Sequence, residues 1–114
     1  MPWLTALAFG GAALPLMTTL AELQRLITDH WIELQGAYKL KRLAFFGSYA
    51  RGEQTPASDV DVLVEFSEPV GFEFVHLADH LEHLFGLPVD LVTPDAIKPN
   101  RRDLILADLV DAQA

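Results

Sequence analysis

The sequence predicts an α/β (α+β) domain in which helices back a small mixed sheet. Three observations carry this prediction. Short apolar runs of strand length alternate with longer segments whose apolar residues recur at helical spacing. Gly, Pro, Asn and Ser mark the boundaries between these segments. With 114 residues, 51% of them hydrophobic, the chain has the length of one domain and enough apolar material for a core.

The composition excludes some classes of site and disfavours others. The chain has no cysteine, so disulfides and thiolate metal centres are excluded. Its formal net charge of −8 argues against direct binding of nucleic acid, which needs a basic surface to neutralise phosphates. An acidic chain is compatible with a basic protein partner, although acidity is also a common route to solubility.

Residues 1–17 form an apolar extension that Gly and Pro interrupt and that carries no charged side chain. The first basic residue is Arg25, whereas a secretory signal begins with a basic region. A membrane span needs about 20 mainly apolar residues, and Pro and Gly interrupt this segment. We expect an upstream start codon, with Met17 as the usual beginning, or a short segment packed on the domain at 18–114; a weak export signal is the third interpretation. No membrane contact is expected, and the cytoplasm is the expected location.

The first element of the domain is predicted to be an amphipathic helix over 20–35. Thr19 and Glu22 occupy the two positions of a capping box, in which each side chain bonds the backbone N–H of the other residue. Gly36 suits the end of this helix. The apolar residues at helical spacing are Leu20, Leu23, Leu26, Ile27, Trp31 and Leu34.

The stretch 43–66 begins with a feature that is suited to phosphate. A strand over 43–46 ends at Gly47-Ser48, where a short helix is predicted to begin. Unpaired backbone N–H groups at such a helix start point outward and bind anions. Taken alone, the Gly-Ser pair is better explained as a plain turn, because both residues are common in turns.

Asp59 and Asp61 open the apolar strand that is predicted over 60–66. Side chains two residues apart share one face of a strand, about 6.6 Å apart along the chain. Two carboxylates so placed repel each other unless a divalent cation binds, and Mg²⁺ takes carboxylates together with substrate phosphates. By themselves, the two residues are explained at least equally well as a loop Asp followed by an exposed Asp at a strand edge. Beside a phosphate-binding turn, they favour transfer from a nucleoside triphosphate.

The second half of the chain predicts a helix, a strand and a further helix. Residues 72–85 place their apolar side chains on one broad face, and Gly86 suits the end of this helix. A strand over 87–93 follows. A last helix is expected from Arg101, with Asn100 as its cap.

Three groups of polar residues in this half have two interpretations each. Asp90 interrupts a short apolar strand, a poor place for an unpaired charge, and is either a ligand or an edge-strand Asp. Arg101 and Arg102 oppose the dipole preference at a helix start, which suggests contact with an anion or a partner, although solvent exposure is simpler. Histidines at i, i+4 and i+7 could chelate zinc, but without an HExxH motif we expect surface residues. They are His76, His80 and His83.

The string GSYARGEQTPASDVDVLVEF resembles the DNA polymerase β-like nucleotidyltransferase superfamily. Its Gly-Ser pair at 47–48, ten intervening residues and the DxD at 59–61 match the GSx10DxD signature of that superfamily. The fuller pattern, GS-x-ARG-x5-SD-x-D, is similar to that of the minimal nucleotidyltransferase (MNT) subgroup. The resemblance covers residues 18–112. The remaining motif positions are filled by Arg51, Gly52 and Ser58.

The resemblance implies the nucleotidyltransferase palm and its two-metal site. Asp59 and Asp61 would hold two Mg²⁺ ions, which lie about 3.5–4 Å apart in such sites. Asp90, on the neighbouring strand, would be the third metal-binding and catalytic carboxylate and would help to activate the attacking hydroxyl. The implied nucleotide-binding residues are Gly47, Ser48 and Arg51.

The resemblance also implies a function. A chain of this type acts as the antitoxin of a HEPN-domain ribonuclease toxin and transfers AMP from ATP to a tyrosine hydroxyl of that toxin. The chain has no room for a domain that would hold a second substrate, so we expect a protein partner to bring the acceptor. Two alternatives remain open: a catalytically silent binding module that neutralises the toxin by occlusion, and an enzyme that modifies a small molecule such as an aminoglycoside.

Overall fold

The computed structural model of the chain describes residues 18–113, so the interpretations of segment 1–17 lie outside the described residues. Within the described part, the strands are β1 (Leu40–Phe46), β2 (Val60–Phe66), β3 (Val89–Val92) and β4 (Val110–Asp111). They form one mixed sheet in the order β3-β2-β1-β4. β1 pairs antiparallel with both β2 and β4, and β2 pairs parallel with β3.

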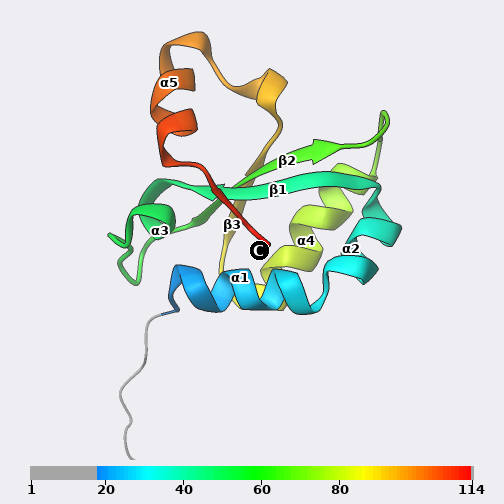
Figure 1. Ribbon diagram of the computed structural model, residues 1–114, viewed down its shortest axis with the longest axis horizontal. Helices are drawn as coiled ribbons and strands as arrows, with labels where there is room; N and C mark the ends of the chain where they lie inside the picture. Colours follow the sequence, from blue (N-terminus) through cyan, green and yellow to red (C-terminus); the bar gives the residue numbers. More distant parts are fainter. Residues whose placement is uncertain (1–17, 114) are drawn as a thin grey trace, which may run out of the picture.

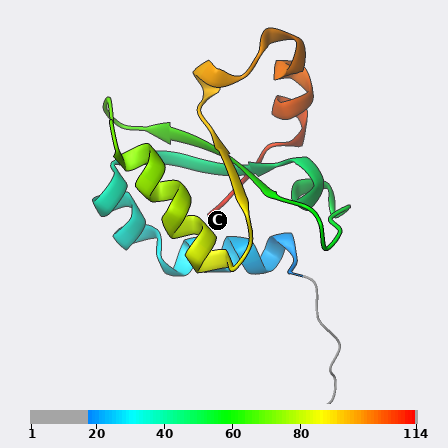
Figure 2. The ribbon, with the colours of Figure 1, turned by 180° about the vertical axis from the view of Figure 1, so that it is seen from behind.

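Helices lie on both faces of this sheet. They are α1 (Leu20–Asp29), α2 (Trp31–Tyr38), α3 (Gly47–Arg51), α4 (Glu73–Phe85), the 3-10 turn η1 (Pro94–Ala96) and α5 (Pro99–Asp108). Figure 1 shows α1, α2 and α4 along one face and α5 over the opposite face, and the view from behind shows the same division (Figure 2). The predicted α/β class, with helices backing a small mixed sheet, is confirmed. Within residues 18–113, no helix is long and apolar enough to cross a membrane.

The alternation of side chains along β2 separates two apolar cores. Val62 is buried in the larger cluster, with residues of α1, α2 and α4. Its neighbour Leu63 is buried in a second cluster with Ile105 of α5. Because successive strand residues point to opposite faces, Asp61 shares the α5 face with Leu63. The same alternation that builds the cores therefore directs this carboxylate away from the main core.

The prediction of a single helix over 20–35 is wrong, because the structure contains two helices there. α1 ends at Asp29 and is capped by His30, whose backbone (φ −111°, ψ 11°) leaves the helical region and whose Nδ1 lies 2.8 Å from the carbonyl oxygen of Leu26. α2 then continues past Gly36 and is closed by Lys39 in the left-handed conformation (φ 59°). The predicted capping box at the start of α1 is confirmed.

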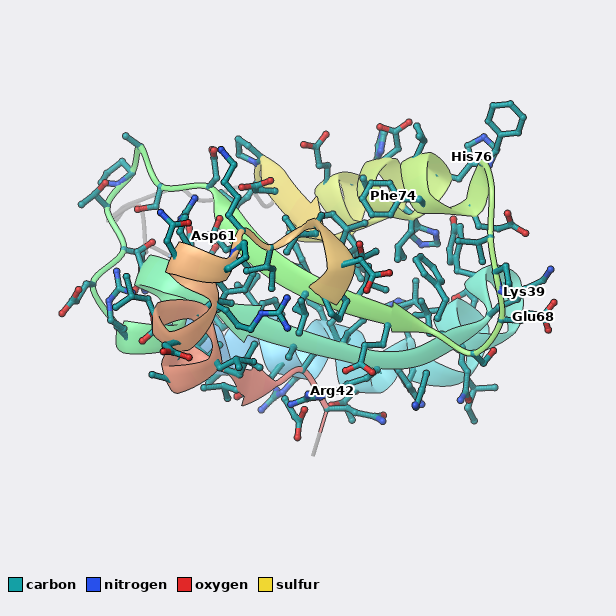
Figure 3. All side chains as sticks on the ribbon, turned by 90° about the horizontal axis from the view of Figure 1, so that it is seen from above. Lys39, Arg42, Asp61, Glu68, Phe74 and His76 are labelled. Carbon is teal, nitrogen blue, oxygen red and sulfur yellow. The ribbon has the colours of Figure 1, made fainter. Side chains whose placement is uncertain are left out.

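Lys39 ends α2 because of contacts that are distant in the sequence. Its Nζ lies 3.2 Å from Glu68 and 3.5 Å from Glu73, and its carbonyl accepts the backbone N–H of Ser67 at 2.8 Å. Figure 3 shows Lys39 and Glu68 side by side at one end of the sheet. These contacts anchor the helix end to the turn that follows β2, so a glycine is not needed at this position.

The C-terminal segment contains a strand that the sequence does not predict. α5 begins at Pro99 with Lys98 as its N-cap, two residues earlier than expected. The strand β4 follows and pairs with β1 at the edge of the sheet. Arg42 of β1 donates from Nε to Oδ1 of Asp111 at 2.8 Å, which holds β4 in place. A strand of two residues is too short to show a period of its own in the sequence.

Candidate active site

A cleft of about 610 Å³ opens between α5 and the start of β2. This volume is within the usual range for sites that bind small ligands. Figure 3 shows Asp61 beside α5, at the opposite end of the sheet from Lys39. The cleft is lined by Phe46, Gly47, Ser48, Arg51, Asp59, Asp61, Arg101, Leu104, Ile105, Ala107 and Asp108.

The pairing of β1 with β2 brings the two halves of the motif together. The strands are antiparallel, so the end of β1 lies beside the beginning of β2, and Phe46 is paired with Asp61. Gly47 follows Phe46 directly and begins α3 next to the carboxylates. Five of the six predicted site residues therefore line one cleft: Gly47, Ser48, Arg51, Asp59 and Asp61.

Gly47 makes a close approach to Asp61 that only glycine permits. Its φ of 75° lies in the left-handed region, which residues with a side chain rarely adopt. A Cβ at this position would overlap Oδ2 of Asp61 and would lie 3.1 Å from its Cγ. The glycine therefore lets the backbone of the turn lie directly against the carboxylate.

Arg51 is held at the side of the cleft by two carboxylates. Its Nε donates to Glu53 at 2.9 Å, and its Nη1 donates to Asp108 of α5. These bonds, the one to Glu53 first, raise the pKa of the Arg51 guanidinium above its ordinary value. The pair with Asp108 ties α3 to α5 and so joins the two walls of the cleft. Ser48, one turn before Arg51, lines the cleft from the same helix.

The pKa of Asp61 is raised from its ordinary value of 3.8 to about 6. Burial is the largest cause, because it disfavours the charged form, and repulsion from Asp90 and then Asp59 adds to it. Arg101 and Arg51 act in the opposite direction without cancelling the rise. The site therefore holds more carboxylate charge than its own arginines balance.

Asp90 is exposed on β3, next to Asp61 rather than in the wall of the cleft. The parallel pairing of β2 with β3 puts Asp61 and Asp90 directly in register. Residues in register on neighbouring strands point to the same face of a sheet. The structure thus brings Asp90 to the carboxylate face, although it is not among the residues that line the cleft.

The donor set fits Mg²⁺, which prefers carboxylate oxygens. A bound cation would relieve the repulsion that raises the pKa of Asp61. Among residues 18–113, no three potential ligands are gathered into a complete metal site. A nucleotide site does not require three protein ligands, because Mg²⁺ there takes one or two carboxylates and completes its shell with substrate phosphates and water.

The raised pKa of Asp61 predicts how the stability of the metal-free protein depends on pH. The folded pKa lies above the unfolded value, so the free energy of unfolding should fall as pH rises from about 4 to about 6. The expected contribution of Asp61 is about 1–2 kcal/mol, since its side chain is only partly shielded from water. Urea unfolding in chelator across this range should show the fall in the wild type and a flatter profile in Asp61→Asn. Equal slopes in the two proteins would contradict this account.

Some residues near the site carry no clear signal in the sequence. Leu104 and Asp108 of α5 reach the cleft only because α5 packs over the sheet. Arg101 has one signal, its position at a helix start. The histidines of α4 do not gather: His80 Nδ1 lies 2.8 Å from the hydroxyl of Tyr38, and His83 Nδ1 lies 2.8 Å from the carbonyl of its own helix. His76 and His83 are exposed, as expected, whereas His80 is half-buried against Tyr38.

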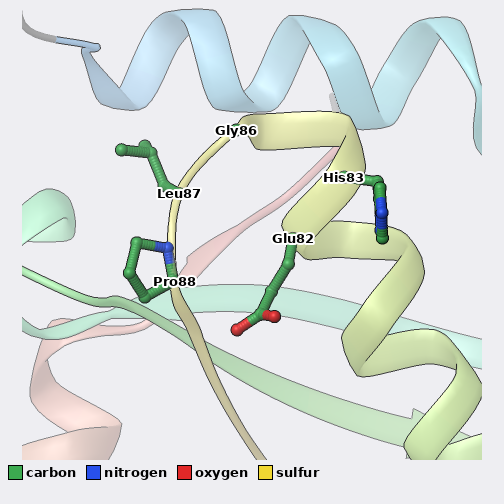
Figure 4. A pocket seen from close by; sticks show the side chains of 5 residues that line it. All are labelled: Glu82, His83, Gly86, Leu87 and Pro88. Atoms are coloured by element: carbon green, nitrogen blue, oxygen red, sulfur yellow. The ribbon is translucent and has the colours of Figure 1, made fainter.

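A second hollow, of about 370 Å³, lies at the end of α4 and shares no residue with the cleft. Figure 4 shows the side chains that surround it, with the carboxylate of Glu82 directed away from α4. Glu82 accepts the backbone N–H of Val89 at 3.0 Å and so fixes the start of β3. The hollow is lined by Glu82, His83, Gly86, Leu87 and Pro88. The one carboxylate of this hollow is therefore already bonded to the backbone.

Comparisons with known proteins agree with the motif. The nucleotidyltransferase domain family matches residues 27–111. The protein adenylyltransferase MntA of Thermococcus cleftensis is 40% identical over 95 residues, which cover 82% of this chain and 96% of the relative. A solved structure of a candidate minimal nucleotidyltransferase superposes with a TM-score of 0.68 at 32% identity, covering 82% of this chain and 95% of that one.

A more distant likeness concerns the fold alone. A solved complex of a tri-AMPylated Shewanella oneidensis HEPN toxin with its MNT antitoxin contains a chain that superposes with a TM-score of 0.55 at 22% identity. The match covers 78% of this chain and 71% of that one. The similarities in sequence, fold and motif agree. The chain is therefore an enzyme of the nucleotidyltransferase family and belongs to its minimal nucleotidyltransferases.

Proposed function

We propose that this chain transfers AMP from ATP to a hydroxyl group of a partner protein, in the cleft between β2 and α5. One observation carries the proposal: the glycine turn lies directly against Asp61, in a cleft of a size that suits a nucleotide. The name of the Thermococcus relative, a protein adenylyltransferase, supports AMP as the transferred group and a protein as the acceptor.

The residues of the cleft divide into two groups by their chemistry. Gly47 and Ser48 would bind the triphosphate through backbone N–H groups and a hydroxyl. Asp59 and Asp61 would hold Mg²⁺, with Asp90 as the third carboxylate. Mg²⁺ bound there supplies positive charge that stabilises the charge developing on the phosphates. Most of the rate enhancement in such a transfer comes from positioning and charge stabilisation.

The transfer is a displacement at the α-phosphorus of ATP. The oxygen of the acceptor hydroxyl forms a bond to the α-phosphorus, the bond from that phosphorus to the bridging oxygen breaks, and pyrophosphate leaves. The hydroxyl proton must go to a base as the new bond forms. We assign this role to Asp90, which is exposed on the carboxylate face and is in register with Asp61.

The partner we propose is a HEPN-domain ribonuclease toxin with a tyrosine acceptor, which makes this chain its antitoxin. The solved complex of an AMPylated HEPN toxin with an MNT antitoxin, whose fold this chain shares, supports that partner. The cleft is open to solvent at α5, where Leu104 is 71% exposed, so a protein surface can reach it. We propose that the domain over 18–114 acts as one unit and that the cytoplasm is where it acts.

The test is the intact mass of a HEPN-domain protein encoded beside this chain, purified after coexpression and incubated with ATP. A mass gain of one or more AMP units with Mg²⁺, and none in excess chelator, is expected. Transfer that persists in chelator would contradict the metal requirement. If the two proteins copurify without any mass change, neutralisation by occlusion replaces transfer as the function. If they do not associate, a small-molecule acceptor becomes the better hypothesis.

A further inference from the structure

Arg101 of α5 is a cation in the wall of the cleft that the motif does not include. It lies in the first turn of α5, and its residue is exposed. Among residues 18–113, no carboxylate lies within ion-pair distance of its guanidinium. A positive charge that faces a cleft without a partner in the described structure is available to a ligand.

Arg51, the other arginine of the cleft, differs in this respect. Two of its five N–H donors already bond Glu53 and Asp108, so carboxylates that join α3 to α5 balance part of its charge. A phosphate bound at Arg51 would share the guanidinium with these carboxylates. Arg101 can offer its planar fork of donors without such sharing.

Arg101 lines the same cleft as Asp59 and Asp61, so its guanidinium shares the site with the carboxylates. Arg101 comes from α5, whereas Gly47 and Ser48 come from α3, so the two sets of donors face the cleft from different walls.

We propose that Arg101 binds the phosphate groups of the nucleotide from the α5 wall of the cleft. The inference rests on the proposed function, because it assumes that a nucleoside triphosphate occupies this cleft. It adds a residue outside the GSx10DxD motif to the nucleotide-binding set. In this account α5 supplies part of the substrate site and also covers the sheet. Guanidinium groups suit this role because they bind phosphate oxygens through two parallel hydrogen bonds.

The test is the affinity of the isolated chain for ATP in the presence of Mg²⁺, measured by calorimetry without any acceptor protein. Arg101→Ala should raise the Kd about ten- to a hundredfold, the usual effect of removing a charge-assisted hydrogen bond. Arg101→Lys should recover part of the affinity, because lysine keeps the charge but lacks the fork. The matched control is Arg102→Ala, one residue along α5, which lines a different hollow and should bind like the wild type.

Three outcomes would count against the proposal. If the wild type binds ATP and Arg101→Ala binds it equally well, Arg101 is not a nucleotide ligand, and the proposed function is untouched. If Arg101→Ala lowers the melting temperature while Arg102→Ala does not, the loss of affinity is structural and the inference fails. If the wild type itself does not bind ATP with Mg²⁺, the proposed function fails together with the inference.

Discussion

Replacing Asp59 and Asp61 together by asparagine should reduce AMP transfer by at least about a thousandfold while leaving the fold intact. The amides keep the size of the side chains but lose the charge that would hold Mg²⁺. The free energy of unfolding of the metal-free double variant at neutral pH should rise by about 1–2 kcal/mol, because a partly buried carboxylate that repels its neighbours is removed. Lower activity with higher stability is the signature expected of a site built for a ligand.

The measurement combines initial rates of AMP incorporation with urea unfolding in chelator. The matched control is Asp95→Asn/Asp103→Asn, which changes the net charge equally at two exposed positions outside the cleft. This control should transfer AMP like the wild type. Substantial activity in Asp59→Asn/Asp61→Asn would exclude these carboxylates as the metal site. Loss of stability instead of a gain would show that the carboxylates support the fold.

Replacing Gly47 by alanine should reduce AMP transfer by about a hundredfold and lower the free energy of unfolding by about 1–3 kcal/mol. Two effects combine at this position. The backbone has a φ of 75°, which is unfavourable for alanine, and the new Cβ would overlap the carboxylate of Asp61. Asp61 has to move away, and a displacement of about 1 Å at a reacting centre is enough for a loss of this size.

Gly86→Ala separates the two effects. Gly86 also has a positive φ, of 68°, but a Cβ there would meet no atom within 4 Å. This control should lose about 1 kcal/mol of stability from backbone strain alone and should keep full activity. Both variants can be compared by urea unfolding and by the rate of AMP incorporation. If Gly47→Ala retains wild-type activity, the contact with Asp61 is not required for the reaction.

Local features of the chain were predicted where short-range physics decides them. The capping box at Thr19 and the closure of α4 by Gly86 were expected from residue type and position. The placement of Asp59 and Asp61 at the start of the strand that became β2 was also expected, whereas the packing of the helices decided that Asp61 points away from the main core. The end of α2 at Lys39 was not predicted, because contacts with the turn after β2 override the local preference for Gly36. The break at His30 was not predicted either.

The sequence by itself determined the family, the class of fold and the residues of the motif, because these depend on residue types at short and regular spacings. Only the tertiary structure decided how α5 completes the cleft. Arg51 meets Asp108 across 57 positions of the chain, and Arg101 and Leu104 reach the site because α5 packs on Leu63. Such contacts follow from how apolar surfaces pack together, and no local period in the sequence encodes them.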